Sequence, residues 1–238
     1  MYFFFCLKRT KTHMKLSVIM PVFNEEKTVQ QAVRQIVSRR DVFELIVVND
    51  GSTDQTSQIL TKLSKRYKRK MRLLQQKNGG KGAAVQLGLK KVQGDYVLIQ
   101  DADLEYDPID IRKLTEPIKK KKAVVVYGSR FLGPHSNLLF WHMMGNHFLN
   151  FTINLLYNTT LSDLETCYKL IPTKLWKELD IQCKDFCIEP EVTCKILKKG
   201  LHIYETPISY MGRDFSEGKK ITWQHGFGAL WTIVRLRF

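Results

Sequence analysis

The strongest constraint on the fold is an alternation, from Leu16 onward, between short apolar runs and longer segments with helical periodicity. This alternation is typical of βαβ units, in which crossover helices join parallel strands. The runs predicted to be strands are "LSVIMPVF", "FELIVVND", "MRLLQQ", "DYVLIQDAD" and "AVVVYGS". We therefore predict an α/β fold in which residues 14–130 form a doubly wound half with a mostly parallel sheet.

Polar residues placed just before the helical segments predict where several helices begin. Asn24 can cap the helix that starts with "EEKTVQQAV", and Ser52 with Gln55 has the spacing of a capping box. Asp107 followed by Pro108 predicts a further helix start, since proline is tolerated in the first turn.

Ligands of doubly wound sheets bind beyond the carboxyl ends of the strands. That rule selects residues 21–25, 49–54, 101–103 and 128–130. If residues 95–103 are extended throughout, Asp101 and Asp103 point to the same side. Two carboxylates that close favour a cation such as Mg²⁺ or Mn²⁺, with a diphosphate supplying the other oxygen ligands. The alternative is a solvated acidic turn.

Two further strand ends could bind parts of a nucleotide. "NGGKGAA" lacks the spacing of a phosphate-binding P-loop, which leaves a Gly-rich turn where Lys81 opens a helix and could meet an anion, or a plain turn. Asp50 can accept a hydrogen bond from a base or a ribose hydroxyl, whereas Asp54 is expected to be a helix cap.

The second half has two apolar helical segments. Within residues 138–157, His142, Asn146, Asn150 and Asn154 form one polar stripe, so this helix is expected to be buried or to lie along a membrane surface. Residues 221–238 have the pattern of an interfacial amphipathic helix that ends in arginines. Packing of both helices on the core or on a partner is the alternative.

Charge and cysteine usage narrow the class of protein. The net charge of +15, from 38 Lys+Arg against 23 Asp+Glu, calls for an anionic partner. Nucleic acid is disfavoured because aromatic residues do not recur among the basic ones: "KRYKRK" contains Tyr67 alone and "KKKK" contains none. Five cysteines without a CxxC pair predict neither a disulfide framework nor a zinc site, and favour a reducing compartment.

The lack of a long apolar run bears on localisation, and the first residues bear on where the fold begins. No run of about 20 apolar residues is present, so we expect a soluble or peripheral protein. Residues 1–13 are expected to be a non-native or disordered extension, because the first predicted strand begins directly behind Met14.

Five segments together resemble family 2 glycosyltransferases of the GT-A fold, within which the chain is most similar to dolichyl- and polyprenyl-phosphate sugar synthases and their bacterial relatives. They are "SVIMPVFNEEKTV", "LIVVNDGSTDQT", "NGGKGAAVQLGL", "GDYVLIQDADLEYDP" and "VVYGSRFLG". The resemblance implies an inverting transfer of a sugar from a nucleotide donor, UDP-glucose or GDP-mannose in type, with Mg²⁺ or Mn²⁺. A polyprenyl phosphate at the cytoplasmic membrane face would be the acceptor, and a membrane-embedded partner subunit is possible.

By position, the resemblance assigns the donor site and the metal. The donor nucleotide would contact Pro21, Phe23, Glu25, Asp50, Lys81, Asp101 and Ala102. Asp101 and Asp103 would bind the metal, with Asp103 and Arg130 in catalytic roles. One departure is Asn49 in place of the first Asp of the usual Asp-Asp pair.

In the second half, Glu189 falls where relatives that act on hydroxyls carry a catalytic base. A hydroxyl acceptor needs such a base, whereas a lipid phosphate is already an anionic nucleophile. With a lipid phosphate, the catalytic role expected of Glu189 is to orient the acceptor or to assist the metal. Arg130, Arg213 and Lys219 would bind the acceptor phosphate. The expected division is a catalytic domain over residues 14–212, followed by a basic acceptor loop and interfacial helix over 213–238. Transfer to a hydroxyl of a glycan, lipid or protein, and a non-catalytic nucleotide-sugar-binding subunit, are the alternatives.

Overall fold

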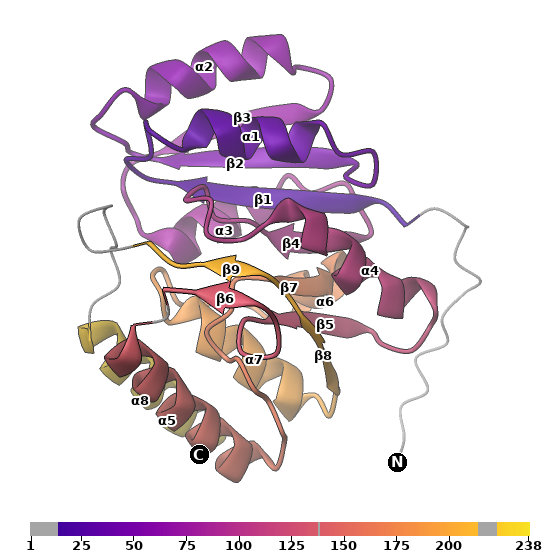
Figure 1. The fold of residues 1–238 in the computed structure, drawn as a ribbon, viewed down its shortest axis with the longest axis vertical. Helices are drawn as coiled ribbons and strands as arrows, with labels where there is room; N and C mark the ends of the chain where they lie inside the picture. The colour runs from indigo at the N-terminus through magenta and orange to yellow at the C-terminus, as the bar shows by residue number, and fades with distance from the viewer. Residues whose placement is uncertain (1–13, 138, 214–222) are drawn as a thin grey trace.

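The computed structural model describes residues 14–137, 139–213 and 223–238, and Figure 1 shows a central sheet covered by helices. The strands are β1 (Leu16–Val22), β2 (Glu44–Asp50), β3 (Met71–Gln76), β4 (Tyr96–Ile99), β5 (Val125–Ser129), β6 (His135–Ser136), β7 (Lys169–Pro172), β8 (Ile203–Pro207) and β9 (Tyr210–Met211). The helices are α1 (Val29–Val37), α2 (Thr56–Arg66), α3 (Lys81–Leu89), α4 (Ile111–Lys119), α5 (Phe140–Tyr157), α6 (Thr173–Glu178), α7 (Ile188–Lys198) and α8 (Trp223–Arg237), with a 3₁₀ turn η1 (Pro108–Asp110).

In the described part of the chain, the main sheet has seven strands in the order β3-β2-β1-β4-β7-β5-β8, and β6 and β9 form a separate pair. Strands β3, β2, β1 and β4 are mutually parallel, as are β5 and β8. Between these groups, β7 runs antiparallel to both β4 and β5. The prediction of an α/β fold with a mostly parallel sheet is confirmed, and all five predicted strands are present.

The core lies on both faces of this sheet. Val18 and Val47 belong to one buried cluster, whereas Ile19 and Ile46 belong to the other. Successive side chains of a strand point to opposite faces, so strands that are apolar throughout need cover on both sides. The helices supply that cover (Figure 1).

The predicted starts of α1 and α2 are wrong in detail. Asn24 has φ of 52° and its Oδ1 accepts a hydrogen bond from Thr53 N (2.8 Å), while Asn24 N donates to Ser52 Oγ (3.0 Å). The turns after β1 and β2 therefore bond to each other, which leaves no capping box. Asp54 does accept from Thr56 N (2.9 Å) at the start of α2, as predicted.

Strand β4 is shorter than predicted. Pairing with β1 ends at Gln100, whose N–H donates to Ile19 O (2.9 Å), and the acids after it lie in a turn where Leu104 has φ of 67°. The extended geometry predicted for Asp101 and Asp103 is therefore wrong. The predicted cap at Asp107 is confirmed, since its Oδ1 accepts from Ile109 N (2.9 Å) at η1.

Helices α5 and α8 pack side by side at one end of the molecule (Figure 1). The buried face of α5 carries Asn150 and Asn154, which hydrogen-bond the segment 161–164. Its other face leaves Trp141 80% and Phe151 62% exposed, and Trp231 of α8 is 65% exposed. Among the described residues, no helix has both the length and the apolar character needed to cross a membrane.

Candidate active site

A cleft of about 1060 Å³ opens where β1, β2 and β4 end, at the edge selected from the sequence. It extends to apolar residues of α5 and α8, including Trp141, Phe148 and Phe227. The cleft contains every described residue that the sequence assigned to the site: Pro21, Phe23, Glu25, Asp50, Lys81, Asp101, Ala102, Asp103, Arg130, Glu189 and Arg213. Lys219 lies outside the described residues, as do residues 1–13.

The Asp50 carboxylate shapes the turn before α3. It accepts hydrogen bonds from Gly79 N and Gly80 N (both 2.9 Å) and from the Gln76 amide (2.7 Å). Gly80 has φ of 92°, and a Cβ there would lie 2.5 Å from Lys184 O. This position therefore needs glycine on two grounds. The turn places Lys81, the first residue of α3, at the cleft wall.

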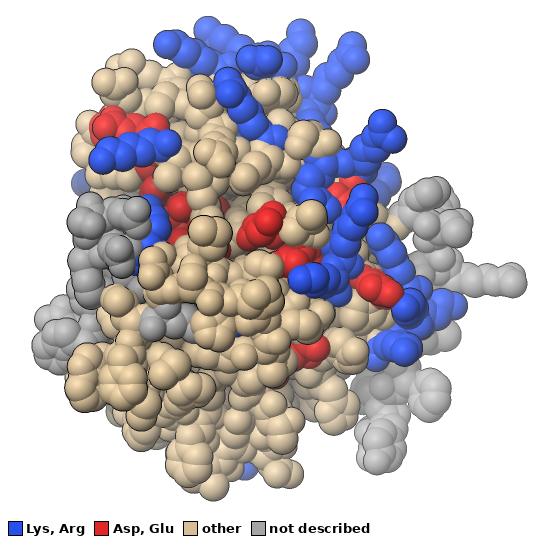
Figure 2. Space-filling view, in the orientation of Figure 1, with Lys and Arg blue, Asp and Glu red and all other residues tan. Residues whose placement is uncertain are grey.

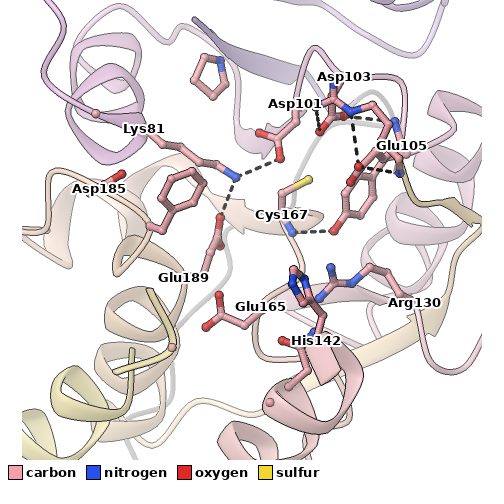
Figure 3. A pocket seen from close by; sticks show the side chains of 18 of the residues that line it. Lys81, Asp101, Asp103, Glu105, Arg130, His142, Glu165, Cys167, Asp185 and Glu189 are labelled. Carbon is pink, nitrogen blue, oxygen red and sulfur yellow. Dashed lines mark hydrogen bonds and ion pairs between the residues drawn. The ribbon is translucent and has the colours of Figure 1, made fainter. Parts of the chain in front are cut away.

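Lys81 connects two acidic residues from distant parts of the chain (Figure 3). Its Nζ lies 3.0 Å from Asp101 Oδ2 and 3.3 Å from Glu189 Oε1. Burial alone would lower the pKa of Lys81, but these two carboxylates raise it well above its ordinary value. The other Glu189 oxygen, Oε2, is 2.6 Å from the fully buried Lys169. Both Glu189 oxygens thus face ammonium groups, which does not suit a catalytic base.

Arg213 is shared among three carboxylates at the opposite wall. Its guanidinium lies 3.3 Å from Glu25, 3.5 Å from Asp103 and 3.5 Å from Glu105. Burial and the neighbouring acids Asp101 and Glu105 raise the pKa of Asp103 to about 8, against the opposing effect of Arg213. This cluster therefore holds more negative charge than its burial favours, and an added cation would stabilise it.

Arg130 is held by Asp163, a residue that sequence reasoning left without a role. The guanidinium makes two hydrogen bonds to the Asp163 carboxylate (2.9 and 2.7 Å), and Arg130 N adds a third (2.8 Å). Asp163 raises the pKa of Arg130 although burial opposes this. A fork fixed in this way presents a permanent positive charge to the cleft.

The fit of a divalent cation depends on Asp101 and Asp103. Within residues 14–137, 139–213 and 223–238, no group of three or more His, Cys, Asp or Glu side chains is suited to hold a metal ion. Mg²⁺ is commonly bound through one or two carboxylates plus substrate phosphates. Two carboxylates beside an under-neutralised acidic cluster fit such an ion, provided that a ligand contributes further oxygens.

The loop between α6 and α7 contains a disulfide between Cys183 and Cys187. The prediction that the cysteines form no disulfide is therefore wrong. It considered CxxC pairs, whereas these two cysteines are separated by three residues in "CKDFC". This loop packs on the start of α3: Ala83 N donates to Lys184 O (2.9 Å), and the Gln86 amide donates to Cys183 O (2.9 Å).

Sequence reasoning places Glu165 near the cleft without a role, and it assigns nothing to Cys167 or Lys169. Glu165 and Cys167 line the cleft, and Lys169 lies beneath it. Burial raises the pKa of the Cys167 thiol well above its usual value, so it is a poor nucleophile. The signal in the sequence is the pair of acids that follows α5, Asp163 and Glu165. Their partners in the fold, such as Arg130 for Asp163, cannot be predicted from the sequence.

Charge is unevenly distributed over the face of the molecule drawn in Figure 2. Figure 2 shows Lys and Arg over the upper and right parts of one face and acidic side chains near its middle. The lower part, where Figure 1 places α5 and α8, is almost free of charged side chains in this view.

Comparison with known proteins identifies relatives of this chain. The family model described as glycosyl transferase family 2 matches residues 17–179. The chain is 27% identical over 205 residues to a low-salt glycan biosynthesis hexosyltransferase of Haloferax volcanii, which covers 84% of this chain and 48% of the relative. It is 28% identical over 222 residues to a dolichyl-phosphate beta-glucosyltransferase of Trichomonas vaginalis, covering 86% and 68%. The chain thus spans about half the length of the first relative.

Solved structures share the fold. Glucosyl-3-phosphoglycerate synthase from Mycobacterium tuberculosis, in complex with Mn²⁺, UDP and glucosyl-3-phosphoglycerate, superposes with a TM-score of 0.73 at 17% identity, covering 94% of this chain and 80% of that one. Staphylococcus aureus TarS with UDP-GlcNAc gives a TM-score of 0.64 at 20% identity, covering 94% and 66%. At these identities the likeness concerns the fold alone.

Proposed function

The chain belongs to glycosyltransferase family 2 and has the GT-A fold, and on that premise we propose that it transfers a hexose, with inversion, from a nucleotide-diphosphate sugar to a polyprenyl phosphate. The donor would be of the UDP-glucose or GDP-mannose type. The similarity to a relative named as a dolichyl-phosphate beta-glucosyltransferase supports this acceptor class.

The observation that carries the proposal is the composition of the cleft. One end gathers Asp101, Asp103, Lys81 and Arg213, and the other is walled by apolar side chains of α5 and α8. A nucleoside diphosphate needs cations and polar groups, whereas an isoprenoid chain needs apolar surface. A single cleft with both features suits an acceptor that is a phosphate at one end and a hydrocarbon at the other.

The residues take separate roles in this proposal. Asp101 and Asp103 would bind Mg²⁺ or Mn²⁺, which when bound would neutralise charge on the departing diphosphate. Asp50, Pro21, Phe23 and Ala102 would contact the nucleotide. The cations Lys81, Arg130 and Arg213 would face the phosphates of donor and acceptor, with Lys219 as a further cation in the same role.

No general base is required for this acceptor. A phosphate oxygen is anionic at neutral pH and can attack without losing a proton. Glu189, whose oxygens face Lys81 and Lys169, would orient Lys81 rather than remove a proton.

The chain would act at a membrane surface, with residues 14–212 as the catalytic unit and 213–238 as the acceptor-side unit. Exposed aromatic side chains on α5 and α8, among them Trp141 and Trp231, support peripheral contact with a membrane. The face proposed is the cytoplasmic one. The comparisons give no support for a membrane-embedded partner subunit.

The test is a matrix of radiolabelled UDP-glucose and GDP-mannose against undecaprenyl and dolichyl phosphate, with Mg²⁺ or Mn²⁺. We expect label in the lipid fraction for one donor, and its loss in Asp103→Asn. Absence of lipid label for every pair would reject the polyprenyl acceptor. Transfer to a lipid or glycan hydroxyl instead, with a bell-shaped pH profile whose basic limb is lost in Glu189→Gln, would favour the alternative acceptor.

A further inference from the structure

The segment 161–168 holds Glu165 rigidly at the floor of the cleft. On the N-terminal side of Glu165, the side-chain amide of Asn150 in α5 donates to Ser162 O, and its Oδ1 accepts from Leu164 N (2.8 Å). Lys169 Nζ donates to the carbonyl oxygens of Leu164 and Thr166, which flank Glu165. Hydrogen bonds therefore fix the backbone on both sides of Glu165. Its side chain lines the cleft near Glu189 (Figure 3).

One oxygen of the Glu165 carboxyl has no hydrogen-bond partner among the residues that the structure describes. Oε1 is buried, and none of the described residues bonds to it. The neighbouring cations are already engaged: Arg130 with Asp163 (2.7 Å) and Lys169 with Glu189 (2.6 Å). A buried polar atom without a partner destabilises the fold, so such atoms are uncommon unless a ligand completes them.

The charge state of Glu165 follows from these surroundings. Burial raises its pKa to about 7; Lys169 opposes this rise and Glu189 adds to it. At neutral pH the carboxyl therefore exists in both forms. It can accept a hydrogen bond when ionised and also donate one when protonated.

The class of ligand group follows by elimination. A phosphate oxygen beside Glu165 would be repelled whenever the carboxyl is ionised. A metal ion would need further ligands, and the described part of the chain offers no suitable group. A hydroxyl suits both states, because it can donate to the ionised carboxylate and accept from the protonated carboxyl. In Figure 3, Glu165 lies between Glu189 and Arg130. Glu189 contacts Lys81, which the resemblance assigns to the donor nucleotide, whereas it assigns Arg130 to the acceptor phosphate. Glu165 would therefore lie between the donor and acceptor phosphates.

We propose that Glu165 binds a hydroxyl of the transferred hexose and so contributes to the choice of donor sugar. This inference rests on the proposed function, because a sugar must occupy the space between the two phosphate sites. It assigns Glu165 a contact with the sugar and none with the nucleoside diphosphate.

The experiment measures binding by calorimetry in Mg²⁺ for four probes: UDP, UDP-glucose, GDP and GDP-mannose. The variants are Glu165→Leu and Glu165→Gln, with Glu178→Gln on α6 as the matched control outside the cleft. We expect the Kd of the nucleoside diphosphate to change less than twofold. The Kd of the preferred nucleotide sugar should rise about tenfold in Glu165→Leu, the loss of one hydrogen bond to a charged group, and less in Glu165→Gln.

A set of 2-, 3-, 4- and 6-deoxy donor analogues identifies the contact. The analogue that lacks the contacted hydroxyl should bind the wild-type chain and Glu165→Leu equally. Equal affinity of both variants and wild type for the nucleotide sugar would overturn the inference while leaving the proposed function intact. If the wild-type chain binds none of the four probes, the proposed function fails and the inference fails with it. Circular dichroism of each variant shows whether it is folded, and Glu165→Gln serves if Glu165→Leu is not.

Discussion

Replacing Lys169 by methionine tests whether the ion pair beneath the cleft is a structural element. Lys169 is fully buried, and its three ammonium hydrogens are used by Leu164 O, Thr166 O and Glu189 Oε2. Methionine fills similar space but leaves the Glu189 carboxylate, 4% exposed, with Lys81 at 3.3 Å as its remaining cation. Breaking a buried pair costs about 3–5 kcal/mol. Because Lys81 compensates in part, we expect a loss near the lower limit, about 3 kcal/mol in the free energy of unfolding.

The assay is urea unfolding followed by circular dichroism, arranged as a double-mutant cycle. Lys169→Met and Glu189→Leu should each destabilise, whereas the double variant should recover most of the loss, because two apolar side chains can replace a buried pair at little cost. Lys174→Met is the control, since Lys174 is 74% exposed and pairs with Glu178 at 3.8 Å; it should change stability by less than about 0.5 kcal/mol. A loss below about 1 kcal/mol in Lys169→Met, or a double variant whose losses simply add, would refute the reasoning.

Three further predictions concern the metal, pH and the disulfide. Asp101→Asn should abolish Mn²⁺ binding in the presence of UDP, measured by electron paramagnetic resonance, because one of two carboxylate ligands is lost; undiminished binding would place the ion elsewhere. Folding raises the pKa of Glu165 from 4.5 to about 7, so the folded state binds more protons than the unfolded state over this pH range. The free energy of unfolding of the wild type should therefore fall, relative to that of Glu165→Gln, by at most about 3 kcal/mol as pH rises from about 4.5 to 8. Parallel stability curves for the two proteins would contradict this. Reduction of the Cys183–Cys187 disulfide, which closes a loop with a sequence separation of 4, should cost about 2 kcal/mol, and the Cys183→Ser/Cys187→Ser variant should show the same unfolding midpoint with and without reductant.

The parallel half of the sheet was predictable because its strands are long apolar runs with one crossover helix each. The edge of the cleft followed from the same pattern, since residues at the carboxyl ends of parallel strands converge. Strand β7 was missed because it has only four residues, Lys169–Pro172, begins with a buried lysine and runs antiparallel. A charged first residue hides such a strand from any search for apolar runs.

The ionic partners in the cleft were not predictable. Glu189 was placed at the site by resemblance, but its contact with Lys169, 20 residues earlier, depends on how α7 packs against β7. Arg213 bonds Glu25 across 188 residues, and no local pattern encodes such a pair. Helix caps failed for a related reason: Asn24 has a partner on a neighbouring turn, which competes with the local bond that the sequence favours.

Strand β5 has a consequence for how the chain can fold during synthesis. Among the described strands, its partners in the main sheet are β7 and β8, and both follow it in the sequence. Strands β1 to β4, by contrast, find partners among themselves. As the chain leaves the ribosome, the apolar run "VVYGS" must therefore wait for residues 169–172 before its first neighbour arrives. During that interval it is an unpaired strand of the kind that associates with other chains, so slow translation of residues 130–172 should favour aggregation more than slow translation before β5.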